Sequence, residues 1–116
     1  MRILLPAAAL LALAACGPAE EAAAPASAGD SHLDCAALIS AADHLIADGV
    51  LPADAEFQGQ LLVAAMTHLN AYAIPEGIAE TEAFKELNLR RGELMDTQSA
   101  EGILARAKSC VADMPD

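Results

Sequence analysis

Apolar residues recur at intervals of three and four along most of the chain after residue 34, and no segment alternates apolar and polar residues with a period of two. Intervals of three and four place side chains on one face of an α-helix, whereas alternation would place them on one face of a strand. The sequence therefore predicts an all-α fold, with several amphipathic helices packed around one small core.

Residues that favour helix ends divide this pattern into four segments. The first helix is expected to begin just after Asp34 and to stop at Gly49, which can adopt the left-handed conformation of a helix end. The second is expected to begin near Asp54 and to end before Ile74, because the residue that precedes Pro75 is disfavoured in the helical region.

The third helix is expected from Thr81 to Met95, although Gly92 weakens its last turn by about 1 kcal/mol relative to alanine. The fourth is expected to start near Ser99 and to stop at Pro115. The residues predicted to face the core are Cys35, Leu38, Ile39, Ala42, Leu45, Ile46, Phe57, Leu61, Leu62, Ala65, Met66, Leu69, Tyr72, Ala73, Ala83, Phe84, Leu87, Leu94, Met95, Ile103, Leu104, Ala107, Cys110, Val111 and Met114.

The first fifteen residues are typical of a targeting segment. Arg2 is followed by an apolar run from Ile3 to Leu13, which is far shorter than the roughly 20 residues that a membrane-spanning helix needs. The segment Leu13-Ala14-Ala15-Cys16 that closes the run resembles the lipobox of bacterial lipoproteins. An ordinary secretory leader followed by an unrelated cysteine is the alternative.

The resemblance to lipoproteins implies a signal peptide over residues 1–15, cleavage before Cys16 and a lipid on the Cys16 thiol. Residue 17 is Gly rather than Asp, and by lipoprotein sorting rules this favours the outer membrane over the inner membrane. The mature protein is then expected to be held on the periplasmic side of the envelope by its N-terminal lipid.

The remaining cysteines are predicted to form a disulfide bond. Once Cys16 carries the lipid, Cys35 and Cys110 are left as a pair in an oxidising compartment. Cys35 lies at the start of the first helix and Cys110 near the end of the fourth, and in an up-down-up-down bundle those two ends meet. A core of about 80 residues with only three aromatic side chains needs such a staple.

Residues 16–31 are expected to form a flexible tether. Between Gly17 and Ser31 the chain contains Ala, Pro, Glu, Gly and Ser with one Asp, and no large apolar residue that could offset the entropy of ordering. The predicted organisation is a signal peptide (1–15), a lipidated cysteine with its tether (16–31) and a four-helix domain (32–116).

The charge of the chain excludes several classes of partner. The formal net charge is -11, and removal of Arg2 with the leader leaves 5 basic and 17 acidic residues, or -12. Such a chain repels phosphate backbones and anionic headgroups, so nucleic-acid binding and electrostatic adsorption to membranes are not expected. Contact with the membrane is expected through the lipid alone.

No catalytic, cofactor or metal motif is present. The sequence has no G-x-S-x-G, H-E-x-x-H or C-x-x-C pattern and no glycine-rich phosphate loop. His32, His44 and His68 fall in different segments, and the pair His44 and Asp48 is typical of a solvated helix face. We therefore expect a protein without catalytic activity, cofactor or metal ion.

The candidate binding residues are Arg91, Asn88, His68 and Tyr72. Arg91 falls within the apolar stripe of the third helix with Asn88 at its edge, and His68 falls within the stripe of the second. One interpretation is that Arg91 extends its charged group to water while His68 borders the core, or that Arg91 is buried against Glu80. The other is a groove in which these residues bind an acidic or carbonyl-bearing ligand.

These observations favour a membrane-tethered interaction module that holds a protein or peptide of the envelope. A small-ligand carrier with a pocket between helices is the first alternative. The two cysteines that bracket a small helical domain also give a loose resemblance to periplasmic acid-stress chaperones and to helical immunity proteins, which implies a chaperone-like or immunity-type role as a further alternative.

Overall fold

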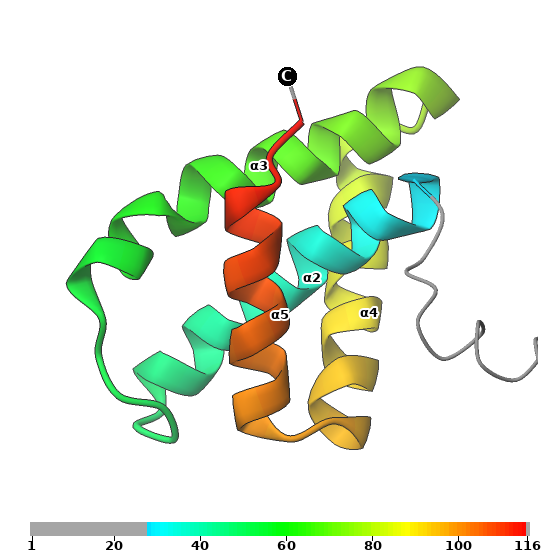
Figure 1. Cartoon of the computed structure of the whole chain (residues 1–116). Coiled ribbons are helices and arrows are strands. Elements are labelled where there is room, and N and C mark those ends of the chain that lie inside the picture. Colours follow the sequence, from blue (N-terminus) through cyan, green and yellow to red (C-terminus); the bar gives the residue numbers. More distant parts are fainter. Residues whose placement is uncertain (1–27, 116) are drawn as a thin grey trace, which may run out of the picture.

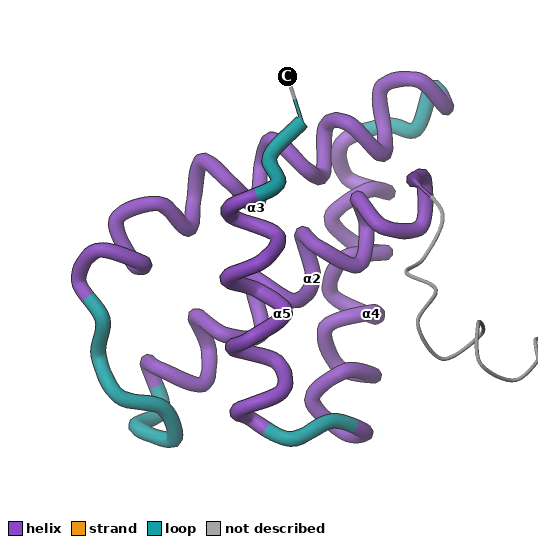
Figure 2. Tube along the Cα trace, in the orientation of Figure 1, coloured by secondary structure: helices purple, strands orange, loops and turns teal. Residues whose placement is uncertain are grey.

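The computed structural model describes residues 28–115. The predicted signal peptide, Cys16 and most of the predicted tether lie outside these residues. The described part folds into α2 (Ala28–Ala47), α3 (Ala55–Glu76), α4 (Glu80–Thr97) and α5 (Ala100–Ala112), and it contains no strand (Figures 1 and 2). The predicted all-α, four-helix fold is confirmed.

The helix α2 lies at the centre of the fold. It packs against each of the other three helices, whereas those three make few contacts with one another. Figure 1 shows α2 passing between α5 in front and α4 behind, with α3 lying across them. The domain is therefore organised around one central helix.

Small side chains on α2 allow this close packing. Ala36, Ala37, Ala41 and Ala42 are fully buried, and because a methyl group takes little space, neighbouring helices can approach α2 on several sides. The larger of two core clusters joins all four helices; its buried residues are Ala37, Leu38, Ile39, Ala41, Ala42, Phe57, Leu61, Ala64, Leu94, Ile103, Ala107 and Cys110. The smaller cluster joins α2 to the end of α3 and the start of α4; its buried residues are Ala36, Leu69, Ala73, Ala83 and Leu87.

The disulfide bond between Cys35 and Cys110 is present. The two Cα atoms are 5.4 Å apart across a sequence separation of 75 residues. The bond joins the N-terminal half of α2 to the last turn of α5, so the predicted closure of the domain by one disulfide is confirmed. Among the described residues, no helix has the length and apolar character needed to cross a membrane.

The end of α3 differs from the prediction. The helix continues through Pro75 to Glu76 and stops at Gly77, whose φ is 68°. Because Pro75 lies in the last turn, its missing N–H removes a single helical hydrogen bond. The N–H groups of Gly77 and Ile78 donate to carbonyls of the last turn, and Ile78 packs against the smaller core cluster. This cap outweighs the preference of Ile74 for extended backbone.

The start of α2 also differs from the prediction. The helix begins at Ala28, so residues 28–31 of the predicted tether are helical. Asp34 consequently lies inside α2 and does not cap it; its carboxylate accepts a hydrogen bond from Arg90 Nε at 2.6 Å. Three other predicted end signals are confirmed, because Gly49 has a φ of 78° and both Asp54 and Ser99 cap the helices that follow them.

Three residues that were predicted to face the core are exposed. Leu62 is 74% exposed, Phe84 is 38% exposed, and Met114 lies beyond α5, which ends at Ala112 rather than at Pro115. A helix that packs mainly on one neighbour buries only one stripe of its surface. Because α3 and α4 each pack chiefly on α2, Leu62 and Phe84 remain outside the stripes that α2 covers.

Candidate functional site

A groove opens between α3 and α4, with α2 as its floor. Its volume is about 320 Å³. Its apolar lining consists of Ile39, Leu61, Leu62, Ala65, Met66, Phe84 and Leu87, and its polar lining of Ser40, Asp43, Gln58, Asn88 and Arg91. The groove exists because α3 and α4 both pack on α2 but scarcely touch each other.

A second hollow continues this surface over the outer side of α4. It has a volume of about 510 Å³ and is lined by Thr81, Phe84, Lys85, Asn88 and Leu89. Phe84 and Asn88 line both hollows, and Leu89 is exposed. The exposed apolar surface therefore extends from the α3–α4 groove onto α4.

Arg91 supplies a positive charge to the groove. It is half-buried, and its guanidinium donates a hydrogen bond to Ser40 Oγ at 2.9 Å. Within residues 32–115 the ion pairs involve Arg90 and Lys108, and none involves Arg91. The predicted pairing of a buried Arg91 with Glu80 is absent, so the guanidinium keeps donors that a ligand could use.

The neighbouring Arg90 has a different environment. It forms ion pairs with Asp34 at 2.6 Å and with Glu93 at 2.9 Å. The hydrogen bonds to Asp34 and then Glu93 raise the pKa of Arg90 further above its ordinary value. Arg90 is therefore engaged within the domain, and it offers a matched control for Arg91.

The structure places His68 in the core rather than in the groove. It is 2% exposed, and its Nε2 lies 2.8 Å from the Cys110 carbonyl oxygen. Because a carbonyl oxygen only accepts hydrogen bonds, Nε2 carries a proton and, in a neutral ring, Nδ1 does not. His68 Nδ1 then accepts a hydrogen bond from the Nδ1–H group of His32, with 3.2 Å between the two nitrogens. His68 thus links α3 to α2 and to the end of α5.

Tyr72 also lies outside the groove. Its hydroxyl donates to the Glu86 carboxylate at 3.0 Å, and its ring packs against the smaller core cluster. Desolvation and the hydrogen bond to Glu86 raise the pKa of Tyr72. Of the four candidate residues, the structure brings Arg91 and Asn88 together and separates His68 and Tyr72 from them.

The sequence interpretation missed one feature of the groove and one feature of the core. Phe84 and Leu62 were assigned to the core, although they line the open groove. The contact between His32 and His68 joins residues 36 positions apart, and no local sequence pattern predicts such a contact. The apolar stripe on α3 is wider than one neighbouring helix can cover. This width is the sequence feature that could have indicated the groove.

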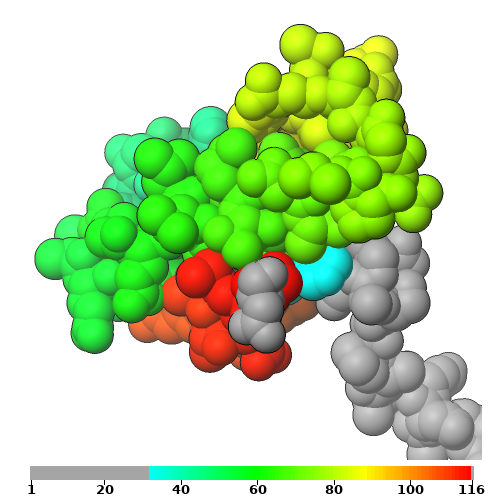
Figure 3. All heavy atoms as spheres, turned by 90° about the horizontal axis from the view of Figure 1, so that it is seen from above, coloured from blue at the N-terminus to red at the C-terminus, as the bar shows by residue number. Residues whose placement is uncertain are grey.

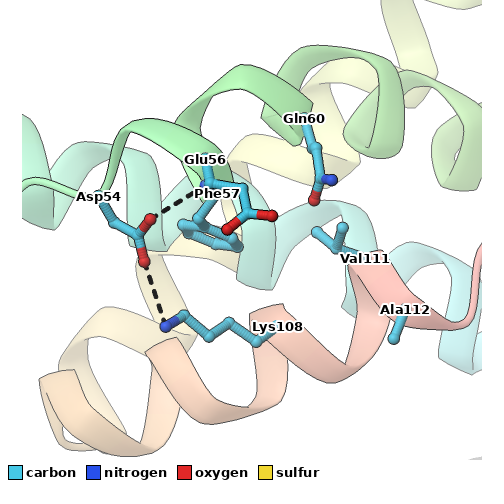
Figure 4. A pocket seen from close by; sticks show the side chains of 7 residues that line it. All are labelled: Asp54, Glu56, Phe57, Gln60, Lys108, Val111 and Ala112. Atoms are coloured by element: carbon cyan, nitrogen blue, oxygen red, sulfur yellow. Dashed lines mark hydrogen bonds and ion pairs between the residues drawn. The ribbon is translucent and has the colours of Figure 1, made fainter.

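Another hollow lies between the start of α3 and α5, as Figure 4 shows. Here Lys108 Nζ is 3.3 Å from Asp54 Oδ2 and 5.8 Å from the centre of the Phe57 ring. The hydrogen bond from the Phe57 N–H and then the contact with Lys108 lower the pKa of Asp54. The charged groups of Asp54 and Lys108 satisfy each other, so this cluster caps α3 and is a weaker ligand site than the groove.

No group of three or more His, Cys, Asp or Glu side chains that could hold a metal ion occurs in the described part of the chain. The histidine pair supplies two nitrogen ligands, whereas protein zinc sites use three or four protein ligands. Comparison of the chain with protein-family models, with curated proteins and with solved structures finds no match.

Proposed function

We propose that the protein is a membrane-tethered, non-enzymatic binding module of the bacterial envelope, whose α3–α4 groove holds an apolar segment of a protein or peptide partner. The observation that carries the proposal is the composition of the groove. Leu62 and Phe84 expose apolar surface at its rim, and Arg91 presents a half-buried positive charge whose one hydrogen bond among the described residues goes to a neutral hydroxyl.

The charges of the groove indicate the chemistry of the occupant. A half-buried guanidinium gains most from a carboxylate, which it can bind with two parallel hydrogen bonds. Asp43 lines the same groove but forms no ion pair with Arg91. We infer that the bound segment combines apolar side chains, which lie on Leu62 and Phe84, with one carboxylate that reaches Arg91.

The shape of the groove favours this function over a small-ligand carrier. Carriers enclose most of the ligand surface in pockets of about 300–1,000 Å³. The groove, at about 320 Å³, is at the lower end of that range and is open along its rim, where Leu62 is 74% exposed. An open apolar surface next to one positive charge suits a segment of a larger partner.

Replacing Arg91 by alanine should weaken the binding of the partner by about 10- to 100-fold, since a hydrogen bond to a charged group contributes about 1.5–3 kcal/mol. The partner would be captured from envelope extracts with the wild-type protein, and its dissociation constant would then be measured for each variant. Arg90→Ala is the matched control, because Arg90 is engaged by Asp34 and Glu93.

Two further results would decide between the alternatives. Substitution of the partner's carboxylate should cost no additional affinity in the Arg91→Ala background, because both changes remove the same contact. Equal binding by wild type, Arg91→Ala and Phe84→Ala on folded protein would contradict a role for the groove. A captured small molecule in place of a protein would instead support the carrier.

The proposed membrane attachment is tested at Cys16. Cys16→Ser should abolish incorporation of labelled fatty acid and leave either an uncut precursor or a protein released from membranes, because a hydroxyl does not replace the thiol in lipid transfer. Fractionation of cells that express each form provides the measurement. Incorporation of the label at the wild-type level in Cys16→Ser would show that the lipid is attached elsewhere or that the lipobox assignment is wrong.

A further inference from the structure

The helix α3 lacks charged side chains over almost its whole length. Between Glu56 and Glu76 the sequence contains no Asp, Glu, Lys or Arg, although the chain has a formal net charge of -11. Figure 3 shows the molecule from above, and in this view α3 faces the viewer. A helix that is uncharged between Glu56 and Glu76 thus lies on the surface of a strongly acidic protein.

The outward face of α3 is partly apolar. Residues spaced by three or four place Gly59, Val63, Met66, Asn70 and Ile74 on one side of the helix. Val63 is 63% exposed and Ile74 is 72% exposed. Neither of these two residues lines the α3–α4 groove, whereas Met66 does, so the outer face of α3 adjoins the groove along Met66 and extends beyond it.

Gly59 leaves room for close packing on this face. It lies within α3 and is exposed, and a Cβ atom built on it would meet nothing within 4 Å. Glycine is a poor helix former, so the isolated domain gives no reason for glycine here. Close approach of another helix gives one, because a missing side chain lets two backbones come together.

We propose that the outer face of α3 packs against the same face of a second copy of the chain. Two molecules that each carry many acidic groups repel each other electrostatically, and the repulsion is smallest where the facing surfaces carry no charge. Among the helices that the structure describes, the long uncharged stretch of α3 meets that condition. A second copy therefore fits this face better than it fits α4 or α5, which carry acidic side chains.

The residues of the face suit an antiparallel, twofold arrangement. If the twofold axis passes between Met66 and Thr67, residue 66 of one copy lies opposite residue 67 of the other. The numbers of every facing pair then sum to 133. Ile74 of one copy then lies over Gly59 of the other, and Val63 lies opposite Asn70. The large exposed side chain meets the position that has no side chain, at both ends of the contact.

The size of the contact predicts a weak dimer. The helix has 22 residues, which gives a length of about 33 Å at 1.5 Å per residue. Stable interfaces bury at least about 1,200 Å² in total, and one helix pair buries that area or less. Attachment of both copies to one membrane would raise their effective concentration and compensate for this. Added salt should strengthen the dimer, because it screens the repulsion between two acidic domains.

The test uses the full-length chain, expressed with its own N-terminal segment, with a photo-crosslinking amino acid in place of Val63. Irradiation of cells should give an adduct of twice the mass of the chain, and its yield in isolated membranes should rise with salt. The same amino acid at Val50, which is exposed outside α3, should give no such adduct. The readout does not depend on the groove or on Arg91. It rests on the proposed membrane attachment, which fatty-acid labelling at Cys16 checks separately.

Two substitutions test the register of the contact. Ile74→Glu should reduce the adduct by about tenfold or more, because twofold symmetry introduces the charge twice into an uncharged interface. Gly59→Ala should also reduce it, whereas Gly92→Ala should not. Gly92 also has open space around it, but its neighbours Arg91 and Glu93 are charged, so it is a matched control for helix stabilisation.

Absence of the double-mass adduct from position 63 would overturn the proposal. An adduct of position 63 with a different protein would also overturn it and would identify that protein as the occupant of the face. An adduct that persists unchanged in both Ile74→Glu and Gly59→Ala would show that the copies meet through another surface. Circular dichroism should confirm that the variants remain folded, since the substituted residues are exposed.

Discussion

Replacing Cys35 and Cys110 together by alanine should lower the free energy of unfolding by about 4 kcal/mol, as the chain-entropy model gives for a closed loop of this length. The bond closes a loop across a sequence separation of 75 residues. Native domains are stable by about 5–15 kcal/mol, and small ones lie near the lower end. A loss of this size would leave the domain close to its unfolding threshold at physiological temperature.

The measurement is urea unfolding of the oxidised wild type, the reduced wild type and the double variant. The reduced wild type and the double variant should show similar losses, because both lack the covalent bond that closes the loop. A reduced protein as stable as the oxidised one would contradict the prediction. It would mean that the packing of α5 on α2 alone restricts the chain as much as the covalent bond does.

The sequence predicted the secondary structure well because helical spacing and helix ends depend on local signals, and it predicted the disulfide because Cys35 and Cys110 were the pair left once Cys16 was set aside. Helical spacing identified four helices, and Asp54, Ser99 and Gly49 act at helix ends as their chemistry predicts. The end of α3 at Gly77 was missed because the preference of the residue before Pro75 is weak compared with a left-handed cap that is held by Ile78. Local preference fails where tertiary packing opposes it.

The candidate site was predicted in part for a different reason. Helical periodicity gives the direction of a side chain but not the identity of the element that it meets. Arg91 and Asn88 were placed correctly on a common surface, because both lie on α4. For His68 two interpretations were open, the border of the core and the same groove, and on α3 it faces α2 and α5. His68 faces the core because α2 lies at the centre of the fold. The pattern of a single helix does not say which helix is central.

Replacing His68 by leucine should lower the free energy of unfolding by about 1–3 kcal/mol, which is the cost of a buried polar group that loses its partner. Leucine fills a similar volume but leaves the Cys110 carbonyl and His32 Nδ1 without their hydrogen bonds to residue 68. The carbonyl belongs to the last turn of α5, where helical donors are lacking. His32 is half-buried and can turn towards water, so most of the loss should come from the carbonyl.

Two variants separate the hydrogen bond from the change of shape. His68→Gln keeps a side-chain N–H that can reach the Cys110 carbonyl, so it should recover part of the stability that leucine loses. His44→Leu is the matched control, because His44 is exposed on α2 and should change the stability by less than about 0.5 kcal/mol. All four proteins would be compared by urea unfolding at pH 7.5, with the disulfide intact. If His68→Leu matched the wild type, the buried imidazole would contribute no net stability, and the link between α3 and the end of α5 would rest on apolar packing and the disulfide.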